Sequence, residues 1–153
     1  MMKSFKNYGV LFLMFVCVIA LLIYIKMWST TYKNDKYSKS YLTDLVQEVK
    51  FSEIEASGKE MNDVFLLITK TNDKTIYKRE KKVYSYLKSV DLIDNFIYLD
   101  VSNEIDYLSK LNGVFGDFKV SNEPILLFIK NGKVVSVIDD FNKIDDIKKE
   151  YQL

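Results

Sequence analysis

The N-terminal part of the chain contains an uncharged, strongly apolar run that constrains its folding more than any other feature. Nineteen residues without a charge separate Lys6 from Lys26, and twelve of the sixteen residues at 10–25 are Leu, Ile, Val or Phe. As an α-helix this run would be about 28 Å long, close to the ~30 Å hydrocarbon thickness of a bilayer. We therefore expect residues 1–8 to form an N-terminal tail and residues 9–28 to form a transmembrane anchor in contact with the lipid bilayer.

The residues around this run favour an anchor over a cleaved signal peptide. A signal peptide usually has an apolar core of about 7 to 15 residues that is followed by small residues. The present run is longer and ends in Lys-Met-Trp at 26–28. Tyr24 and Trp28 stand where an aromatic belt would meet the lipid headgroups. Cys17 lacks the small preceding residues of a lipidated cysteine, so we interpret it as part of the apolar packing surface.

Charge and length give opposing indications of the topology. Lysines after the run, among them Lys33 and Lys36, outnumber those before it, and the positive-inside rule then favours a cytoplasmic C-terminal part. Long domains translocate largely regardless of such charges, and a short N-terminal tail is typical of a signal anchor. We expect a single-pass protein of the cell membrane with an extracytoplasmic C-terminal domain. The alternative is a cytoplasmic domain that serves as a structural partner of a membrane complex.

The composition excludes several kinds of chemistry. The chain has no histidine, and its only cysteine, Cys17, lies in the apolar run. These absences remove the usual general base, the Ser-His and Cys-His pairs and any intramolecular disulfide. From Ser29 onward, 19 basic and 21 acidic residues nearly balance, and Arg79 is the only arginine, so we expect no nucleic-acid partner. We also predict no cofactor and no metal site.

Residues 29–153 divide into a short polar segment and one domain. Residues 29–40 are lysine-rich and lack an apolar pattern, so we expect a tether there and a domain at residues 41–153. Strand–helix–strand units followed by a hairpin predict an α/β fold, a mixed sheet with helices on both faces. Apolar periodicity and turn signals predict the following elements: a helix at 41–49, a helical turn at 52–57 ended by Gly58, a strand at 64–70, a helix capped by Asp73, a strand at 96–101, a helix from 103 or 104 to 111 stopped at Gly113, strands at 125–130 and 134–138 around Asn131-Gly132, and a helix at 141–151.

Two segments of the domain resemble the thioredoxin-like fold. The first is VFLLITK, followed by a turn, a long helix and the strand FIYLDVS. The second is VFGDFKVSNEPILLFIKNGKVVSVID, in which Pro124 precedes a strand and Asn131-Gly132 follows it. The fold carries a cis-proline at such a position, whereas the sequence leaves the isomer of Glu123-Pro124 open. Among proteins of this fold, the chain looks most similar to the small membrane-anchored thioredoxin-like proteins of low-GC Gram-positive bacteria, including the bacteriocin transport accessory proteins.

The resemblance implies a site at the turn after the central strand and beside the proline. Redox members carry Cys-x-x-Cys in this turn, where a helix N-terminus lowers the thiol pKa. Residues 71–77 contain no cysteine, so we predict no thiol–disulfide exchange. The groove beside the proline would remain available for an extended chain that docks through backbone hydrogen bonds. The candidate binding residues are Thr71, Asn72, Asp73, Lys74, Thr75, Asn122, Glu123 and Pro124.

These observations predict a membrane-anchored, cysteine-free binding or accessory module that is not an enzyme, with an exported peptide or a membrane protein as its partner. The alternative is a sulfur-independent enzyme of the same fold, such as a glutathione-binding transferase in which Thr71 or Thr75 is the polarising hydroxyl. We interpret both threonines as turn and capping residues. The basic run at 78–82 is interpreted as a solvated helix face, and lipid contact is the alternative if this face turns toward the membrane.

Overall fold

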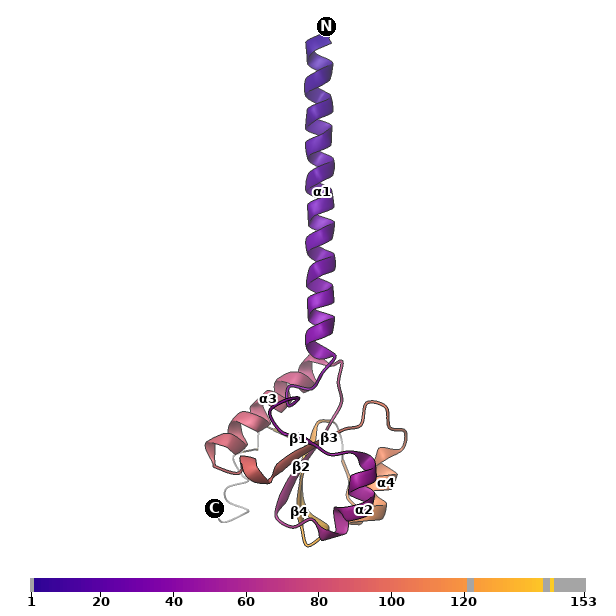
Figure 1. Cartoon of the computed structure of the whole chain (residues 1–153), viewed down its shortest axis with the longest axis vertical. Coiled ribbons are helices and arrows are strands. Elements are labelled where there is room, and N and C mark those ends of the chain that lie inside the picture. Colours follow the sequence, from indigo (N-terminus) through magenta and orange to yellow (C-terminus); the bar gives the residue numbers. More distant parts are fainter. Residues whose placement is uncertain (1, 121–122, 142–143, 145–153) are drawn as a thin grey trace. The chain divides into compact units, whose positions relative to one another are not determined.

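The computed structural model describes residues 2–120, 123–141 and 144 (Figure 1). The chain divides into two compact units, Met1–Lys36 and Tyr37–Leu153. The first unit is formed by one unbroken helix, α1 (Met2–Tyr37). The side chains at 8–28 are all exposed, and the helix is long and apolar enough to cross a bilayer. This confirms an N-terminal apolar helix that is a candidate for a transmembrane span.

The helix α1 continues through most of the segment 29–40, for which the sequence predicts an unpatterned tether. No glycine or proline interrupts this segment. The hydroxyls of Thr30 and Thr31 donate to the carbonyl oxygens of Lys26 and Met27, each at 3.0 Å. Such bonds to the residue four positions earlier occupy the side chain within the helix and leave the backbone ladder intact. The polar segment is therefore helical for most of its length.

The second unit is built on a five-stranded mixed sheet with the strand order β1-β3-β2-β4-β5. The central strand β2 pairs in parallel with β3, where Leu67 lies opposite Tyr98. On its other side β2 pairs antiparallel with β4, where Leu67 lies opposite Leu126. The combination of parallel and antiparallel pairing confirms the predicted mixed sheet. The strands are β1 (Gln47–Glu48), β2 (Val64–Thr69), β3 (Phe96–Asp100), β4 (Ile125–Lys130) and β5 (Lys133–Ile138).

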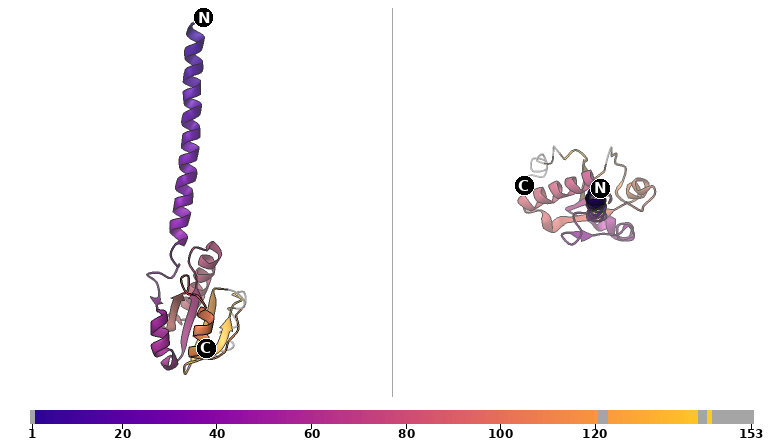
Figure 2. Two further views of the ribbon diagram at one scale, coloured as in Figure 1. Left: turned by 90° about the vertical axis from the view of Figure 1, so that its right-hand side faces the viewer. Right: turned by 90° about the horizontal axis from the view of Figure 1, so that it is seen from above.

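Helices cover both faces of this sheet, as the sequence predicts (Figures 1 and 2). The helix α3 (Lys74–Ser89) packs on one face, and α2 (Phe51–Ser57) and α4 (Tyr107–Phe115) pack on the other. The short 3-10 turns η1 (Gly58–Glu60) and η2 (Ile93–Asn95) precede β2 and β3. The sheet therefore forms the middle layer of three.

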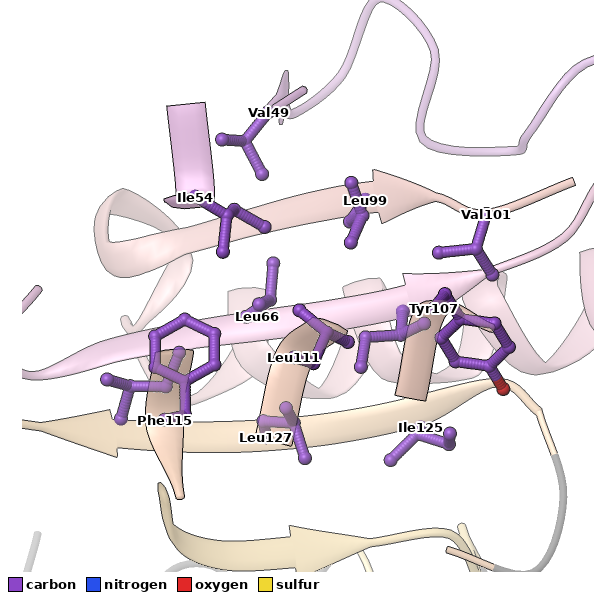
Figure 3. Packing of buried hydrophobic residues seen from close by; sticks show 12 residues of the cluster. Val49, Ile54, Leu66, Leu99, Val101, Tyr107, Leu111, Phe115, Ile125 and Leu127 are labelled. Carbon is purple, nitrogen blue, oxygen red and sulfur yellow. The ribbon is translucent and has the colours of Figure 1, made fainter. Parts of the chain in front are cut away.

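The strand β2 is buried on both sides. Phe65 and Leu67 belong to the core under α3, whereas Leu66 and Ile68 belong to the core under α2 and α4. Figure 3 shows this second core, in which Leu66 lies among side chains of α4 and the neighbouring strands. Successive side chains of a strand point to opposite faces, so an unbroken apolar run indicates a strand covered on both sides. The two cores fix β2 and thereby the turn that follows it.

The predicted helix at 41–49 is wrong. Residues 41–46 form a turn in which Asp44 has a φ of 69°, a left-handed conformation that interrupts a helix, and β1 follows. Leu42 lies in the core under α3, whereas Val49 lies in the core on the opposite face of the sheet. The apolar side chains here are spaced three and four residues apart because the chain passes from one face of the sheet to the other at its edge. They do not form one face of a helix.

The bounds of α4 also differ from the prediction. The helix begins at Tyr107 because Asp106, with a φ of 55°, is left-handed and not helical. It continues through Gly113 and ends at Phe115, where Gly116 has a φ of 91°. The second glycine, not the first, is therefore the stop signal. The predicted final helix at 141–151 lies almost entirely outside the described residues.

Candidate functional site

The turn between β2 and α3 ends in a well-formed helix cap at Asp73. The Asp73 carboxylate accepts hydrogen bonds from the N–H groups of Thr75 (2.6 Å) and Ile76 (3.1 Å). A helix N-terminus leaves its first N–H groups without backbone partners and attracts a negative charge. At α3 the chain's own carboxylate satisfies both needs.

Thr71 ties the same turn to the loop after β3. The Thr71 N–H donates to the Ser102 hydroxyl at 2.8 Å, and the two side-chain hydroxyls lie 3.0 Å apart. Ser102 in turn donates to the Asp100 carboxylate through its N–H and its hydroxyl. The Thr71 hydroxyl is thus part of a local hydrogen-bond chain between two loops. This arrangement agrees with its interpretation as a turn residue.

Glu123 is the point where three segments meet. Its carboxylate lies 2.7 Å from the Lys70 ammonium group at the end of β2 and accepts a hydrogen bond from the Tyr107 hydroxyl of α4. Its carbonyl oxygen accepts a hydrogen bond from the Arg79 guanidinium of α3 at 3.3 Å. The next residue, Pro124, is buried, and the Glu123–Pro124 peptide bond is cis. The loop before β4 is therefore held to the end of β2, to α4 and to α3.

The electrostatics of this cluster favour an ionised Glu123. Burial raises the pKa of the Glu123 carboxyl, but the hydrogen bonds from Lys70 and Tyr107 outweigh burial, and the net pKa is lowered. Burial, followed by the contact with the Glu123 carboxylate, raises the pKa of the Tyr107 hydroxyl. The Lys70 ammonium group also lies 5.3 Å from the centre of the Tyr107 ring. At neutral pH the cluster is a carboxylate held by one ammonium group and one neutral phenol.

An open hollow adjoins the cluster. Its volume is about 500 Å³, and Lys70 and Tyr107 form part of its lining together with the loop before α4. The lining combines a cation, two carboxylates, an aromatic ring, an aliphatic side chain and a hydroxyl. Such a mixed surface offers both hydrogen-bonding and apolar contacts. The lining residues are Lys70, Glu104, Asp106, Tyr107, Leu108 and Ser109.

A buried carboxyl group lies at the end of β2, on the side covered by α3. The Glu80 side chain is 1% exposed. It accepts hydrogen bonds from the Thr69 hydroxyl (2.6 Å), the Tyr41 N–H (2.7 Å) and the Ser40 hydroxyl (2.9 Å). Burial raises the pKa of Glu80 and the nearby Asp100 charge adds to this, while the three hydrogen bonds only partly offset the effect. Glu80 thus joins the start of the domain to β2 and α3.

The two predicted walls of the site are connected through residues that flank the first of them. Glu123 contacts Lys70, which precedes the turn at 71–75, and Arg79, which follows it in α3. Lys74 and Thr75 are exposed in the first turn of α3, and the Asn72 N–H donates to the Tyr37 carbonyl oxygen at 2.7 Å. Asn122 lies outside the described residues.

The sequence reasoning missed four residues of this site, namely Lys70, Arg79, Ser102 and Tyr107. Each contacts a predicted residue from a distant part of the chain. Lys70 could have been found, since it is the polar residue that ends the buried run of β2. The sequence gives no comparable signal for Ser102 or Tyr107. As a binding site, the whole set stays a prediction.

Comparison with solved structures establishes the fold. The chain is similar to thioredoxin f2 of Chlamydomonas reinhardtii, with a TM-score of 0.52 and 10% identity over 70% of this chain and 96% of that chain. It is also similar to mitochondrial thioredoxin 3 of Saccharomyces cerevisiae, with a TM-score of 0.52 and 16% identity over 75% of this chain and all of that chain. The domain therefore has a thioredoxin-like fold. No protein-family model and no curated protein sequence matches the chain.

The cysteine content separates this chain from the dithiol chemistry of that fold. The only cysteine, Cys17, lies in α1, so residues 37–153 contain no thiol. Exchange through a Cys-x-x-Cys pair needs two thiols, one to attack and one to resolve the mixed disulfide. The fold is thus present without the residues of that reaction.

Proposed function

We propose that the protein is a membrane-anchored, cysteine-free thioredoxin-like module that binds an extended polypeptide segment beside Pro124. Its partner is an exported peptide or a component of a membrane complex. The observation that carries this proposal is the convergence of the end of β2, α3 and α4 on Glu123, next to an open hollow with a mixed lining. A site of this kind can hold a chain without transforming it.

The state of the helix N-terminus supports binding over catalysis. Asp73 already supplies the anion that the N-terminus of α3 attracts. The Thr71 hydroxyl bonds to Ser102. A transferase would need a hydroxyl poised toward a thiol ligand at this place. The Thr71 hydroxyl is instead bonded to Ser102, and the Asp73 carboxylate caps α3. We therefore place the function in recognition.

The helix α1 supports a membrane location for this module. Its apolar part has the length of a bilayer, and charged residues follow it at Lys26 and Lys33. The resemblance to membrane-anchored thioredoxin-like and bacteriocin transport accessory proteins leads to the same proposal. We further propose that residues 37–153 lie on the extracytoplasmic side, where an exported peptide would be met.

Site-specific photo-crosslinking in cells tests the binding site. A photoreactive residue at Thr75, in the first turn of α3, or at Ser109, in the lining of the hollow, leaves the Glu123 cluster intact. The control position is Lys133, an exposed residue at the start of β5. It pairs with Lys130, at the end of β4 that is far from Pro124. We expect discrete adducts with the same partner from Thr75 and Ser109 and none from Lys133.

The partner is then identified by mass spectrometry of the adducts. A peptide or a membrane protein in the adducts from both site positions supports the proposal. Equal labelling from Thr75, Ser109 and Lys133 would remove the hollow from consideration. A turnover of glutathione by the purified protein that is lost in Thr71→Val would replace the binding function with the enzymatic alternative.

A further inference from the structure

The helix α3 concentrates positive charge that the rest of the domain lacks. Residues 74–89 contain six basic residues and a single acidic one, Glu80, which is buried. The remaining residues of 37–153 contain eleven basic and nineteen acidic residues. A domain of nearly balanced charge thus carries one strongly basic helix on an otherwise acidic body. Asymmetry of this size creates a directed electrostatic attraction toward an anionic surface.

The basic residues of α3 form a stripe on its outer face. Lys74, Lys78, Lys81 and Lys88 follow the three- and four-residue spacing of one helix face, and Lys82 flanks them; all five are exposed. Residues three and four apart on a helix lie on one side. Val83 and Leu87 are buried against the sheet on the opposite side of α3. We call these five lysines the basic stripe.

The basic stripe carries no compensating carboxylates within the described part of the chain. There the ion pairs join Lys70 to Glu123, Lys110 to Glu104 and Lys130 to Asp63. None of them includes a residue of the stripe. An ordinary solvated helix face mixes charges of both signs, because neighbours of opposite charge stabilise the helix. Five lysines without an acidic neighbour on their face instead match a partner that supplies negative charge.

The chain enters the domain along this same helix. The Tyr37 ring packs edge-on against the Tyr77 ring of α3, with the ring centres 5.3 Å apart. Tyr41 makes the same kind of contact with Tyr77, at 5.4 Å. Only ten residues separate Tyr37 from Lys26, where the apolar run ends. Of the surfaces of the domain, the N-terminal part of α3 therefore has a short covalent route to the membrane that we propose for α1.

We propose that the basic stripe docks on the anionic headgroup surface of the membrane that holds α1. This proposal rests on the membrane anchoring proposed above. The attraction of lysines to a negative leaflet is effective within a Debye length of about 8 Å at physiological salt. The anchor keeps the domain near the leaflet at a high effective concentration, so a modest attraction suffices. An acidic protein partner of the stripe is the competing outcome.

The test uses the full chain with Cys17→Ser, labelled with a fluorophore at a single new cysteine. Ser85→Cys lies within the basic stripe, and Ser57→Cys lies on α2, on the other face of the sheet; both serines are exposed. Each protein is reconstituted into vesicles of phosphatidylcholine, or of phosphatidylcholine with phosphatidylglycerol, that contain lipids with a nitroxide on the headgroup. Flotation of the protein with both kinds of vesicle first establishes insertion.

We expect the label at Ser85 to be quenched at least about twofold more in the anionic vesicles, with the difference lost at high salt. The label at Ser57 should show no such difference. The double variant Lys78→Glu with Lys81→Glu should abolish the effect at Ser85. The matched variant Lys59→Glu with Lys133→Glu, which changes the same charge at exposed sites outside α3, should leave it unchanged.

The outcomes separate the docking from the anchor. Flotation without a difference in quenching at Ser85 would overturn the docking and leave the anchor in place. The basic stripe would then be assigned to an acidic protein partner. Absence of flotation with either vesicle would overturn the anchor, and the docking with it. An equal loss of quenching in both double variants would show that overall charge, and not the stripe, drives the contact.

Discussion

Gly132 is the residue whose backbone tolerates the least change. It has a φ of 70°, and a Cβ at this position would lie 2.2 Å from the Lys59 carbonyl oxygen. Its N–H also donates to the Met61 carbonyl oxygen at 2.8 Å. The hairpin between β4 and β5 therefore touches the chain before β2 through a glycine that has no substitute. Both the left-handed conformation and the close approach require it.

We predict that Gly132→Ala destabilises the domain. The left-handed conformation costs an alanine about 1 kcal/mol and overpacking typically costs roughly 1–3 kcal/mol, so we expect the free energy of unfolding to fall by roughly 2–4 kcal/mol. Urea unfolding of the full chain in detergent micelles, followed by circular dichroism, measures it. The matched control is Asn131→Gly, at a φ of 52°, which should change stability by about 1 kcal/mol or less. Similar values for the two variants would contradict the close approach.

Asp73 offers a second prediction at this scale. Because its carboxylate accepts two N–H groups of α3, Asp73→Ala should lower the free energy of unfolding by about 1 kcal/mol. Asn is an equally good cap, so Asp73→Asn should cost only a few tenths of this amount, roughly 0.3 kcal/mol. The same urea unfolding compares the two. Equal losses for Ala and Asn would mean that charge, rather than capping geometry, provides the stabilisation.

Single residues were predictable from sequence where their role is local. Asp73 as a helix cap and Asn131-Gly132 as a hairpin turn are confirmed, because each acts on residues within a few positions. The partners at the candidate site were not predictable. Thr71 and Ser102 are 31 positions apart, and Lys70 and Glu123 are 53 positions apart. Such pairs are set by how strands are ordered in the sheet, which no local pattern encodes.

Glu80 links α3 to β2 and to the segment at 40–41. Its protonation should make the stability of the domain depend on pH. Its pKa is raised above the ordinary value of 4.5, mainly by burial, with a contribution from Asp100. The folded state therefore holds the proton more tightly than the unfolded state does. The resulting stabilisation is fully present below the unfolded-state pKa and is lost as the pH rises through the folded-state pKa. The hydrogen bonds from Thr69, Tyr41 and Ser40 lower this pKa and only partly offset burial.

Comparison with Glu80→Gln isolates this effect. The amide is uncharged at every pH and can bond the same two hydroxyls if they reorient. We expect the free energy of unfolding of the natural chain, relative to Glu80→Gln, to be highest near pH 4 and to fall toward pH 8. Urea unfolding at a series of pH values measures the difference, in which titrations common to both proteins cancel. A difference independent of pH would show that Glu80 keeps one protonation state throughout.

Whole elements were predictable where one pattern had one meaning. The buried runs of β2, β3 and β4 and the helix α3 were all foreseen, because their apolar periodicity extends over complete elements. The segment at 41–49 has a helical spacing but only nine residues, and its apolar side chains divide between the two faces of the sheet. In a short segment at a sheet edge, tertiary contacts determine the conformation more than the spacing of apolar residues does. The predicted bounds of α4 were wrong for a related reason. The left-handed conformations of Asp106 before the helix and Gly116 after it could not be recognised in the sequence.

At the scale of the whole molecule, two independent parts follow from the sequence. The apolar run predicts α1, and the periodic part predicts the thioredoxin-like domain, because one pattern suits lipid and the other suits a layered core. The helical continuation of α1 to Tyr37 was the part that the sequence did not reveal, since a polar segment without a stripe has no tertiary signal. The helix of the apolar run continues into it, because helix propagation is easier than nucleation and no glycine or proline interrupts the backbone.

The side of the membrane is the property of the whole molecule that the proposed function needs most. We predict that residues 37–153 are extracytoplasmic, because the proposed partner is an exported peptide and long domains translocate largely regardless of flanking lysines. The variant Cys17→Ser with Ser57→Cys provides one exposed thiol in the domain. A membrane-impermeant maleimide should label it in intact cells as completely as in lysed cells.

The natural chain, whose only cysteine is Cys17, gives the control for this topology. Cys17 should stay unlabelled in intact cells if α1 crosses the bilayer, since a membrane-impermeant reagent does not enter the hydrocarbon region. Labelling of Ser57→Cys only after lysis would place the domain in the cytoplasm. An exported peptide could not then be its partner, and the hollow lined by Lys70 and Tyr107 would have to bind a protein assembled on the inner face of the membrane.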